Sequence, residues 1–348
     1  MHHRRHAVLL AAALALPLLA QSRPPRYQAD LSWPKPLPER WILGGLGGVC
    51  VDRQDHVVIL NRQDVLPGEL NTGQLAPPII EFDTAGNVVH SWGDLKILDP
   101  RLHSCAFDKD NNFWIASAPS GMVQKYTHDG SKLLLQIGEK GKLDSVDGTE
   151  KGKGLNTPGP AFYMPSSLFA DPSTGELFVA DGEGRNSNHR IAVFDHNGKF
   201  LRQWLPDMSY VHCLAAASDG LIYVCDREGA KIQVFDKMGR LLKTFSLPWT
   251  PVTPPPAGAK NSGFGGAVVA IDFSRDPAQK YMFVINQNNG VIDIVERETG
   301  QKLGSFGREG RFAGEFDQPH GIAIDSRGNI YIAENRGKKV LRFSPARN

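Results

Sequence analysis

Three histidines recur at regular intervals along the chain of 348 residues. They are His103, His212 and His320, separated by 109 and 108 residues, and each precedes a small residue. Three neutral imidazoles that leave a fourth position open are a common way for proteins to hold catalytic zinc. The spacing predicts a metal centre, provided that the fold brings the three rings together. Zinc is the expected ion, although another divalent transition ion suits the same ligands.

Charged side chains elsewhere could act beside such an ion. Arg62 and Arg227 each follow an apolar, strand-like run, and Glu183 lies in a glycine-rich turn. Two arginines near a metal indicate a substrate with an anionic group, a carboxylate held by charge-assisted hydrogen bonds. Salt bridges within the fold are the alternative role for these arginines. Further charged residues expected on the same face are Arg185 and Arg336.

A loose internal repeat explains how distant residues could meet. Each unit contains a short apolar strand ending near an aspartate, a polar turn and further apolar strands rich in β-branched and aromatic residues. The units are about 50 to 60 residues long, a period typical of propeller blades. The first-strand aspartates are Asp52, Asp108, Asp171, Asp219, Asp272 and Asp325. The second strands expected to follow them are His56–Leu60, Phe113–Ser117, Leu177–Asp181, Ile222–Asp226, Met282–Asn286 and Ile330–Glu334.

The repeats predict an all-β fold, a six-bladed β-propeller in one domain spanning residues 21–348. The sixth repeat stops after its third strand, and the segment Tyr27–Trp33 is a strand-like run without a partner. An N-terminal strand that completes the last blade would close the ring and remove an exposed sheet edge. The segment Pro248–Gly258 is then an inter-blade loop.

The three histidines open the first strands of repeats two, four and six. The matching places in repeats one, three and five hold small residues, approximately Gly47, Ser166 and Ala267. Two blades of a six-bladed ring are a third of a turn, so the imidazoles are expected to converge on the central axis at one level. The remaining histidines are interpreted as turn or surface residues: His56, His90, His128, His189 and His196.

Composition and charge narrow the class of partner. The chain holds 39 basic and 37 acidic residues, and apolar residues make up 41% of it. The two arginines of the first 20 residues are not matched by any acid there, so the remainder is electrically balanced. Zero net charge without a basic run argues against nucleic acid as the main partner. A small-molecule or peptide substrate and a monomeric protein are expected.

Residues 1–20 are interpreted as a secretory signal peptide. A basic start containing Arg4 and Arg5 precedes the apolar stretch Ala7–Ala20, which is short for a membrane span. The expected location is therefore secreted or periplasmic, away from the membrane. The four cysteines are compatible either with a disulfide between Cys50 and Cys105, which occupy similar places in neighbouring repeats, or with buried free thiols.

The repeats resemble those of NHL-type propellers. Leu102-His103, Val211-His212 and Pro319-His320, together with Asn61-Arg62 and Asp226-Arg227-Glu228, resemble peptidyl-α-hydroxyglycine α-amidating lyases over roughly residues 43–343. The resemblance implies a six-bladed propeller that cleaves a C-terminal α-hydroxyglycine into a peptide amide and glyoxylate. It further implies that the three histidines bind zinc and that Arg62 and Arg227 meet the substrate carboxylate.

Three positions depart from the pattern of this family, and at one of them, around Gln318, the methionine that precedes the last histidine in the family is replaced. Glu183 stands near the place of a tyrosine that serves these lyases as base, and desolvation that raises its pKa would suit it to that role. Tyr163 and Tyr210, which precede blade openings, are the other candidate bases. Gly321 replaces an acid that serves a structural calcium ion in the family, so the sequence does not support calcium.

Two other functions fit a propeller. A non-catalytic binding or scaffold propeller is the main alternative, favoured by the missing tyrosine and opposed by the retained histidines. A calcium-dependent lactonase would need carboxylate and amide ligands at the axis instead of imidazoles. The sequence therefore favours a zinc-dependent carbon–nitrogen lyase.

Overall fold

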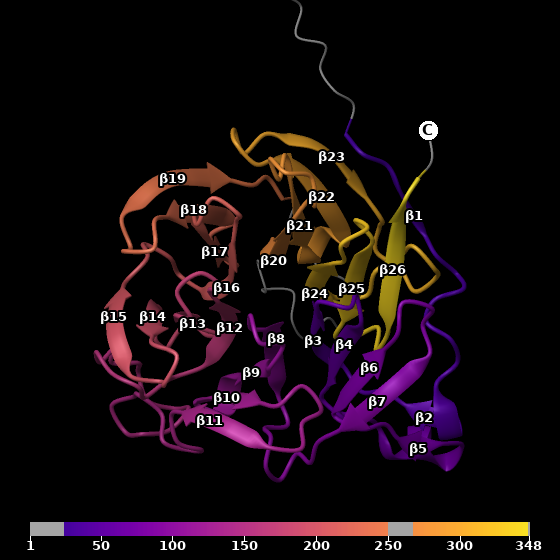
Figure 1. Ribbon diagram of the computed structural model, residues 1–348, viewed down its shortest axis with the longest axis horizontal. Coiled ribbons are helices and arrows are strands. Elements are labelled where there is room, and N and C mark those ends of the chain that lie inside the picture. Colours follow the sequence, from indigo (N-terminus) through magenta and orange to yellow (C-terminus); the bar gives the residue numbers. More distant parts are fainter. Residues whose placement is uncertain (1–23, 250–266, 347–348) are drawn as a thin grey trace, which may run out of the picture.

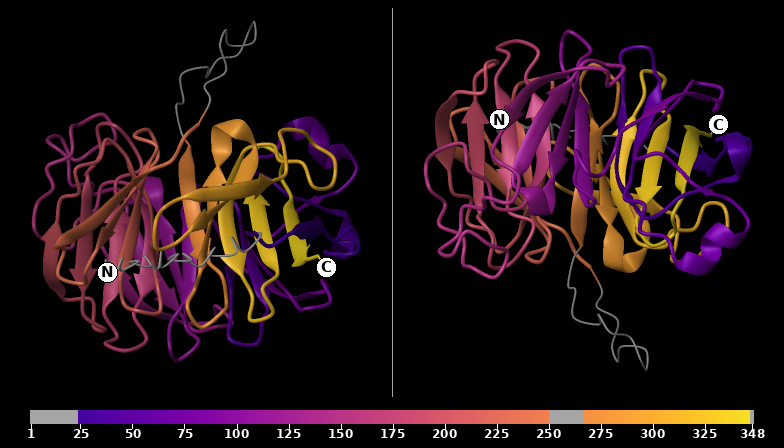
Figure 2. Two further views of the ribbon diagram at one scale, coloured as in Figure 1. Left: turned by 90° about the horizontal axis from the view of Figure 1, so that it is seen from above. Right: turned by 90° about the horizontal axis from the view of Figure 1, so that it is seen from below.

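Short strands rich in β-branched and aromatic residues pair into six four-stranded antiparallel sheets in the computed structural model, which describes residues 24–249 and 267–346. The sheets surround a central axis, with the first strand of each blade innermost (Figure 1). Seen from the side, the strands run roughly along that axis, so the loops gather on two opposite faces (Figure 2). The predicted six-bladed β-propeller is confirmed.

The strands of each of the first three blades pair in the order in which they follow one another along the chain. Blade one consists of β3 (Leu46–Val51), β4 (Val57–Asn61), β6 (Ile79–Phe82) and β7 (Val88–Trp92). Blade two consists of β8 (Leu102–Phe107), β9 (Phe113–Ser117), β10 (Met122–Tyr126) and β11 (Leu133–Ile137). Blade three consists of β12 (Pro165–Ala170), β13 (Leu177–Asp181), β14 (Arg190–Phe194) and β15 (Phe200–Trp204).

The last three blades complete the ring. Blade four consists of β16 (Val211–Ala216), β17 (Ile222–Asp226), β18 (Lys231–Phe235) and β19 (Leu241–Ser246). Blade five consists of β20 (Val268–Phe273), β21 (Tyr281–Asn286), β22 (Val291–Glu296) and β23 (Lys302–Phe306). Blade six consists of β24 (Pro319–Ile324), β25 (Ile330–Glu334), β26 (Val340–Pro345) and the N-terminal β1 (Tyr27–Ala29).

The short β1 closes the ring as predicted, pairing antiparallel with β26 so that Tyr27 faces Pro345. Outside the blades, β2 (Trp41–Ile42) and β5 (Gln74–Leu75) form a small parallel pair. Single 3₁₀ turns occupy the connections: η1 (Pro38–Arg40), η2 (Pro67–Asn71), η3 (Ala118–Ser120) and η4 (Gln287–Asn289). Among the described residues no helix is long and apolar enough to cross a membrane.

The core lies between neighbouring blades. Second strands are buried almost throughout because each has a paired strand on both edges and a blade on both faces. Fourth strands, at the outer edge of each blade, are mostly half-buried or exposed. Between blades one and two, for example, Val58 and Leu60 pack against Phe113 and Ile115. The ring is therefore held by apolar contacts that no single repeat makes alone.

Most predicted strands agree with the structure to within one residue, but two of the repeat aspartates are not equivalent to the others. In blade four the backbone place of Asp52 belongs to Ala217, and Asp219 lies in the turn that follows. In blade five Ser274 takes that place, and Asp272 lies within β20. The aspartates mark the repeats without keeping one fixed register, because turns of different length connect the strands. The predicted signal peptide and most of the predicted loop at 248–258 lie outside the described residues.

A recurring side-chain contact holds the loops on the face where first strands begin. The last residue of several second strands turns back to accept a backbone N–H of the segment that precedes the first strand of its own blade. Asn61 accepts from Gly44, Asp181 from Tyr163, and Asp226 from Tyr210, all through a side-chain oxygen. In blade six Glu334 accepts from the N–H of Asp317 at 2.9 Å.

This contact predicts a pH-dependent stability. Burial raises the pKa of the fully buried Glu334 from 4.5 to about 7. The folded protein therefore keeps a proton that the unfolded chain releases, and stability falls as pH rises from about 4.5 to about 7. Glu334→Gln, which keeps an acceptor for the N–H of Asp317, is expected to remove about 3 kcal/mol of this loss. Urea unfolding at pH 5 and pH 8 measures it, and an equal pH dependence in both proteins would contradict the expectation.

Both pairs of cysteines form disulfides. Cys50–Cys105 joins the first strands of blades one and two, which confirms the disulfide alternative for this pair. Cys213–Cys225 links β16 to β17 within blade four, where the two residues lie directly opposite each other. The second bridge was not predicted because the spacing in sequence does not reveal which residues of a hairpin face each other.

Candidate metal centre

A β-bulge at the start of each first strand directs the three histidines toward the axis. In β8, β16 and β24 the pairing with the second strand skips one residue, and that residue is His103, His212 and His320, respectively. In β3 and β12 the skipped residues are Gly47 and Ser166. A bulged residue leaves the alternation of the sheet and its side chain is re-aimed. These five bulges thus turn the same position of each blade inward, whereas in β20 the pairing skips two residues, Val269 and Ala270.

The three imidazoles meet as predicted. Their ring centroids lie 4.7 to 5.3 Å apart, and one ring nitrogen of each lies within 4.8 Å of those of the other two. All three residues are buried, with exposed fractions of 5%, 1% and 7%. A cavity of about 120 Å³ adjoins them along the axis, lined by the first strands of all six blades. Its walls include the small residues Gly48, Ser104 and Gly321.

The intervening blades orient the rings through backbone carbonyls. The Nδ1 atoms of His103, His212 and His320 lie 2.5, 2.7 and 2.8 Å from the carbonyl oxygens of Ser166, Val269 and Gly47. A carbonyl only accepts, so each Nδ1 must carry the proton. Each Nε2 then presents a lone pair, as a metal ligand does. The acceptor in blade five is Val269, two residues beyond the alanine expected there.

Glu183 points its carboxylate at these lone pairs. Its Oε2 lies 3.0 Å from Nε2 of His212 and 3.5 Å from Nε2 of His103. The loop after β13 approaches closely because residue 182 is glycine: a Cβ there would lie 2.6 Å from the Cβ of Val211. The N–H of Glu183 donates to the carbonyl of Met164, which fixes the backbone at this point.

The contact between Glu183 and the histidines brings acceptors together. With Nδ1 protonated, the Nε2 atoms of His103 and His212 face a carboxylate oxygen, and none of these three buried atoms has a hydrogen-bond partner among the described residues. Buried lone pairs that face each other are unfavourable unless a proton or a cation lies between them. The donor set therefore fits a divalent metal ion, with three imidazoles and one carboxylate oxygen around it.

The surroundings of the site shift the pKa values of His103, His320 and Glu183. Burial lowers the pKa of His103 to about 4 and that of His320 well below its ordinary value. Burial alone would raise the pKa of Glu183, but the charge interactions with His212 and then His103 outweigh it and hold the pKa well below 4.5. The raised pKa that would suit Glu183 to the role of base is therefore not present.

The two predicted arginines both lie beside the histidines, held by different contacts. Nε of Arg62 donates to the carbonyl of Leu102, at the residue before His103. Arg62 and this carbonyl can meet because residue 47 is glycine. A Cβ there would lie 1.7 Å from the carbonyl oxygen of Leu102. Arg227 is buried, with Nη1 3.6 Å from Oε1 of Glu183. Both guanidinium groups therefore lie close enough to the carboxylate of Glu183 to interact with its charge.

Gln287 is a residue of the site that the sequence analysis missed. It is 5% exposed, accepts a hydrogen bond from Nη2 of Arg227 at 2.7 Å, and donates to the carbonyl of Pro319, the residue before His320. Gln287 follows the second strand of blade five, where Arg62 and Arg227 follow theirs in blades one and four. Comparison of these positions between repeats could have identified it.

The two candidate tyrosines differ in their surroundings. The hydroxyl of Tyr163 donates to the backbone carbonyl of Glu150 at 2.6 Å, in a different loop. Tyr210 instead stacks on His212 with ring centroids 6.1 Å apart, and the guanidinium of Arg227 lies over its ring. Burial, followed by the charge of Glu183, raises the pKa of Tyr210. The structure thus places Tyr210, rather than Tyr163, in contact with site residues.

The remaining arginines of this face are held in ion pairs. Arg185 is paired with Glu228, with Nε 2.8 Å from a carboxylate oxygen, and 69% of its side chain is exposed. Arg336 pairs with Asp317 and lies 3.6 Å from Glu309. Arg185 and Arg336 are thus engaged in salt bridges, and the ion pair of Arg227 with Glu183 also agrees with the alternative role given above for Arg62 and Arg227.

The chain matches a known repeat model in two blades and aligns with known proteins over most of its length. The NHL repeat model matches residues 208–235 and 316–343, within blades four and six. The chain is 24% identical over 358 residues to peptidyl-glycine alpha-amidating monooxygenase B of Xenopus laevis, covering 92% of this chain and 36% of that protein. It is 26% identical over 360 residues to the corresponding protein of Rattus norvegicus, covering 91% and 32%. The chain thus spans about a third of the length of these relatives.

A shorter relative is matched over most of its length. Peptidyl-alpha-hydroxyglycine alpha-amidating lyase 2 of Drosophila melanogaster is 24% identical over 348 residues, covering 92% of this chain and 74% of that protein. Among solved structures, a streptogramin B lyase superposes with a TM-score of 0.57 at 12% identity, covering 92% of this chain and 98% of the other. At that identity the structural likeness concerns the fold alone.

Proposed function

We propose that this chain, which carries NHL repeats and is homologous to peptidylglycine alpha-amidating monooxygenases and an amidating lyase, is a zinc-dependent carbon–nitrogen lyase. The substrate would be an N-acyl-α-hydroxyglycine, such as a peptide ending in α-hydroxyglycine, and the products an amide and glyoxylate. The observation that carries the proposal is the convergence of His103, His212, His320 and Glu183 on one buried point.

His103, His212 and His320 would hold the ion, oriented by the carbonyls to which their Nδ1 atoms donate. A divalent ion at this point would lower the pKa of a hydroxyl bound to it. This contribution matters here because the low pKa of Glu183 makes that carboxylate a weak base toward a free alcohol.

Glu183 is proposed to move the proton. Its Oε2 faces the same point as the imidazole nitrogens, within reach of a hydroxyl held there. Glu183 takes the hydroxyl proton, the carbon–oxygen bond becomes a carbonyl, and the carbon–nitrogen bond breaks with its electron pair going to nitrogen. The nitrogen then receives the proton, which leaves an amide and an aldehyde acid. No oxidant or reductant is required.

Arg62 and Arg227 are proposed to bind the substrate carboxylate. They flank the tripod, the group formed by His103, His212 and His320, from blades one and four. Nη2 of Arg227 donates to the side-chain oxygen of Gln287, which helps to hold Arg227 in place. Planar guanidinium groups bind a carboxylate in a fixed orientation, which would place the adjacent hydroxyl carbon over the histidines. The two disulfides are consistent with the expected export of the protein, since such bonds persist in oxidising compartments.

The test of this function is release of glyoxylate from benzoyl-α-hydroxyglycine by the zinc-loaded protein, with benzamide measured as the second product. Equal amounts of both products, formed only with metal present, would support the proposal. A protein that binds zinc at the tripod but releases neither product from this or from peptide substrates would instead support a non-catalytic binding propeller.

Substitution of Arg227 tests the proposed carboxylate contact. Arg227→Lys keeps the positive charge but loses the planar donor pair, so KM is expected to rise about ten-fold or more with a smaller change in kcat. Arg336→Lys is the matched control, since Arg336 shares this face but pairs with Asp317. Steady-state kinetics on the same substrate measure both, and an unchanged KM in Arg227→Lys would contradict the role.

A further inference from the structure

Each backbone carbonyl that directly precedes a histidine of the tripod accepts a hydrogen bond from a side chain of the blade before it. The three pairs are Nε of Arg62 with Leu102 at 2.9 Å, Oγ of Ser166 with Val211 at 3.0 Å, and Nε2 of Gln287 with Pro319 at 3.0 Å. Side chains of blades one, three and five thus help to hold the strands that carry the histidines in blades two, four and six.

Gln287 is the donor of this set that also holds a neighbouring arginine. Its Oε1 accepts a hydrogen bond from Nη2 of Arg227 at 2.7 Å, so one buried amide links that guanidinium to the strand of His320. The backbone keeps the two residues in register, because Ala267 donates its N–H to the carbonyl of Arg227 and accepts the N–H of Gln287, both at 3.1 Å. Gln287 therefore helps to set where Arg227 lies relative to the histidines.

A second glutamine of the fold makes the same two kinds of contact. Oε1 of Gln203 accepts from Nη1 of Arg190 at 2.8 Å, and its Nε2 donates to the carbonyl of Asn156 at 2.9 Å. Nε of the fully buried Arg190 also donates to the carboxylate of Asp181, which is equally buried, at 2.9 Å. The charge of Arg190 is therefore balanced within blade three, as a structural role requires.

The carboxylate beside Arg227 is more distant and is shared with other groups. Nη1 of Arg227 lies 3.6 Å from Oε1 of Glu183, whose Oε2 faces the imidazoles of His103 and His212. The hydrogen bond of Nη2, at 2.7 Å, is made to a neutral amide, which holds the guanidinium without cancelling its charge. A buried guanidinium in this position favours an anionic ligand, and a planar carboxylate matches its geometry.

We propose that Gln287 sets the preference of this site for a carboxylate ligand: its amide fixes the guanidinium of Arg227 beside the strand of His320 and leaves the positive charge to the ligand. This inference rests on the proposed function, in which Arg227 meets the substrate carboxylate. Gln287 is a positioning residue, since it acts through Arg227. A carboxylate in place of the amide would accept the same hydrogen bond but would cancel the charge, so the neutrality of the side chain is what matters.

Binding of hippurate to the zinc-loaded protein tests the inference without turnover. Hippurate, N-benzoylglycine, has the carboxylate of the proposed substrate but no hydroxyl, and hippuramide is its neutral analogue. Gln287→Met is expected to raise the Kd for hippurate about ten-fold, because it fills similar space without holding the guanidinium. Gln287→Glu is expected to raise it about 100-fold, because it also cancels the charge. The weaker binding of hippuramide is expected to stay unchanged in both variants.

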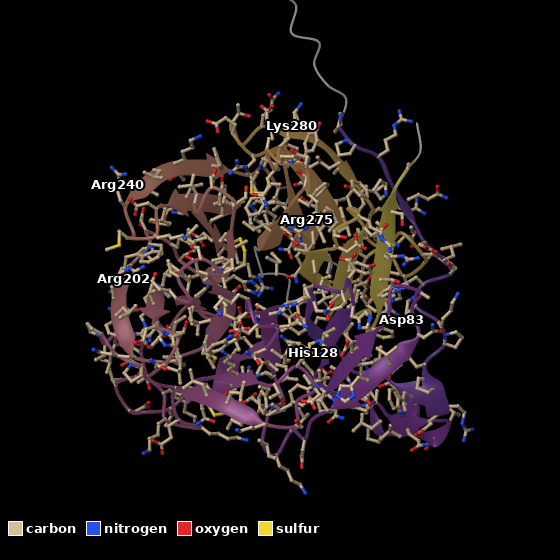
Figure 3. All side chains as sticks on the ribbon, in the orientation of Figure 1. Asp83, His128, Arg202, Arg240, Arg275 and Lys280 are labelled. Carbon is tan, nitrogen blue, oxygen red and sulfur yellow. A yellow bond between two sulfur atoms is a disulfide. The ribbon has the colours of Figure 1, made fainter. Side chains whose placement is uncertain are left out.

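Gln203→Met is the matched control for these variants. It removes the same bridge between an arginine and a backbone carbonyl, but in β15 at the outer edge of the ring, where Figure 3 labels the neighbouring Arg202. It is expected to bind hippurate like the unaltered chain. All variants are expected to keep the zinc of the tripod, because its three imidazoles are unaltered. With benzoyl-α-hydroxyglycine, Gln287→Met is expected to raise KM with a smaller change in kcat.

Equal Kd values for hippurate in the unaltered chain and in both Gln287 variants would overturn the inference. A loss of hippuramide binding as large as the loss of hippurate binding would also overturn it, since Gln287 would then not act through charge. An unaltered zinc-loaded chain that binds no hippurate would overturn it as well. If hippurate binding follows the expected pattern but no glyoxylate is released, the lyase function fails and the role of Gln287 in carboxylate binding stands.

Discussion

His212→Ala is expected to lose the tripod zinc and to reduce lyase activity by about 10³-fold or more, because two imidazoles do not hold the ion and a hydroxyl then keeps its ordinary pKa. His212 is 1% exposed, and its Nε2 is the ring nitrogen nearest to Glu183, at 3.0 Å. Zinc content and glyoxylate release, measured on the same preparations, check the expectation.

The alanine variant also removes the donor to the carbonyl of Val269, so loss of fold must be separated from loss of metal. His212→Asn keeps an N–H that can reach that carbonyl but has no atom in the place of Nε2, and it is expected to lose zinc and activity equally. His90→Ala, which alters a histidine bound to the carbonyl of Asp129, is the control expected to keep both. Full activity in either His212 variant without metal would refute the zinc mechanism.

Glu183→Gln is expected to lower kcat by about 10² to 10³-fold while the tripod keeps its zinc. The amide is nearly the same shape but cannot take a proton from the substrate hydroxyl. The ion is expected to stay bound because the three ring nitrogens still converge on it. Single-turnover glyoxylate release at saturating zinc measures the chemical step.

Glu228→Gln is the matched control for this experiment. Glu228 lies on the same face but pairs with the exposed Arg185, so its neutralisation should leave kcat unchanged. An unchanged kcat in Glu183→Gln would exclude Glu183 as the base and direct attention to Tyr210, which contacts both His212 and Arg227. Tyr210→Phe would then be the informative variant.

The sequence by itself determined the propeller and the position of its candidate metal centre. Strand periodicity and turn residues depend on local chemistry, so the six repeats, the closing strand β1 and the alternation of histidine with small residues could all be read from the order of the amino acids. Residues at equivalent places in alternate blades of a six-bladed ring face the same axis. The sequence positions of His103, His212 and His320 therefore predict that the three side chains converge there.

Contacts between blades were decided only by the tertiary structure. The bulges that turn the histidines inward, the carbonyls of Ser166, Val269 and Gly47 that set their tautomer, and the low pKa of Glu183 each depend on how one blade packs on the next. A repeat pattern specifies the strands of each blade. The angle and depth at which neighbouring blades pack depend on side chains that are far apart in sequence. This packing decides which groups meet at the axis, and so the chemistry there.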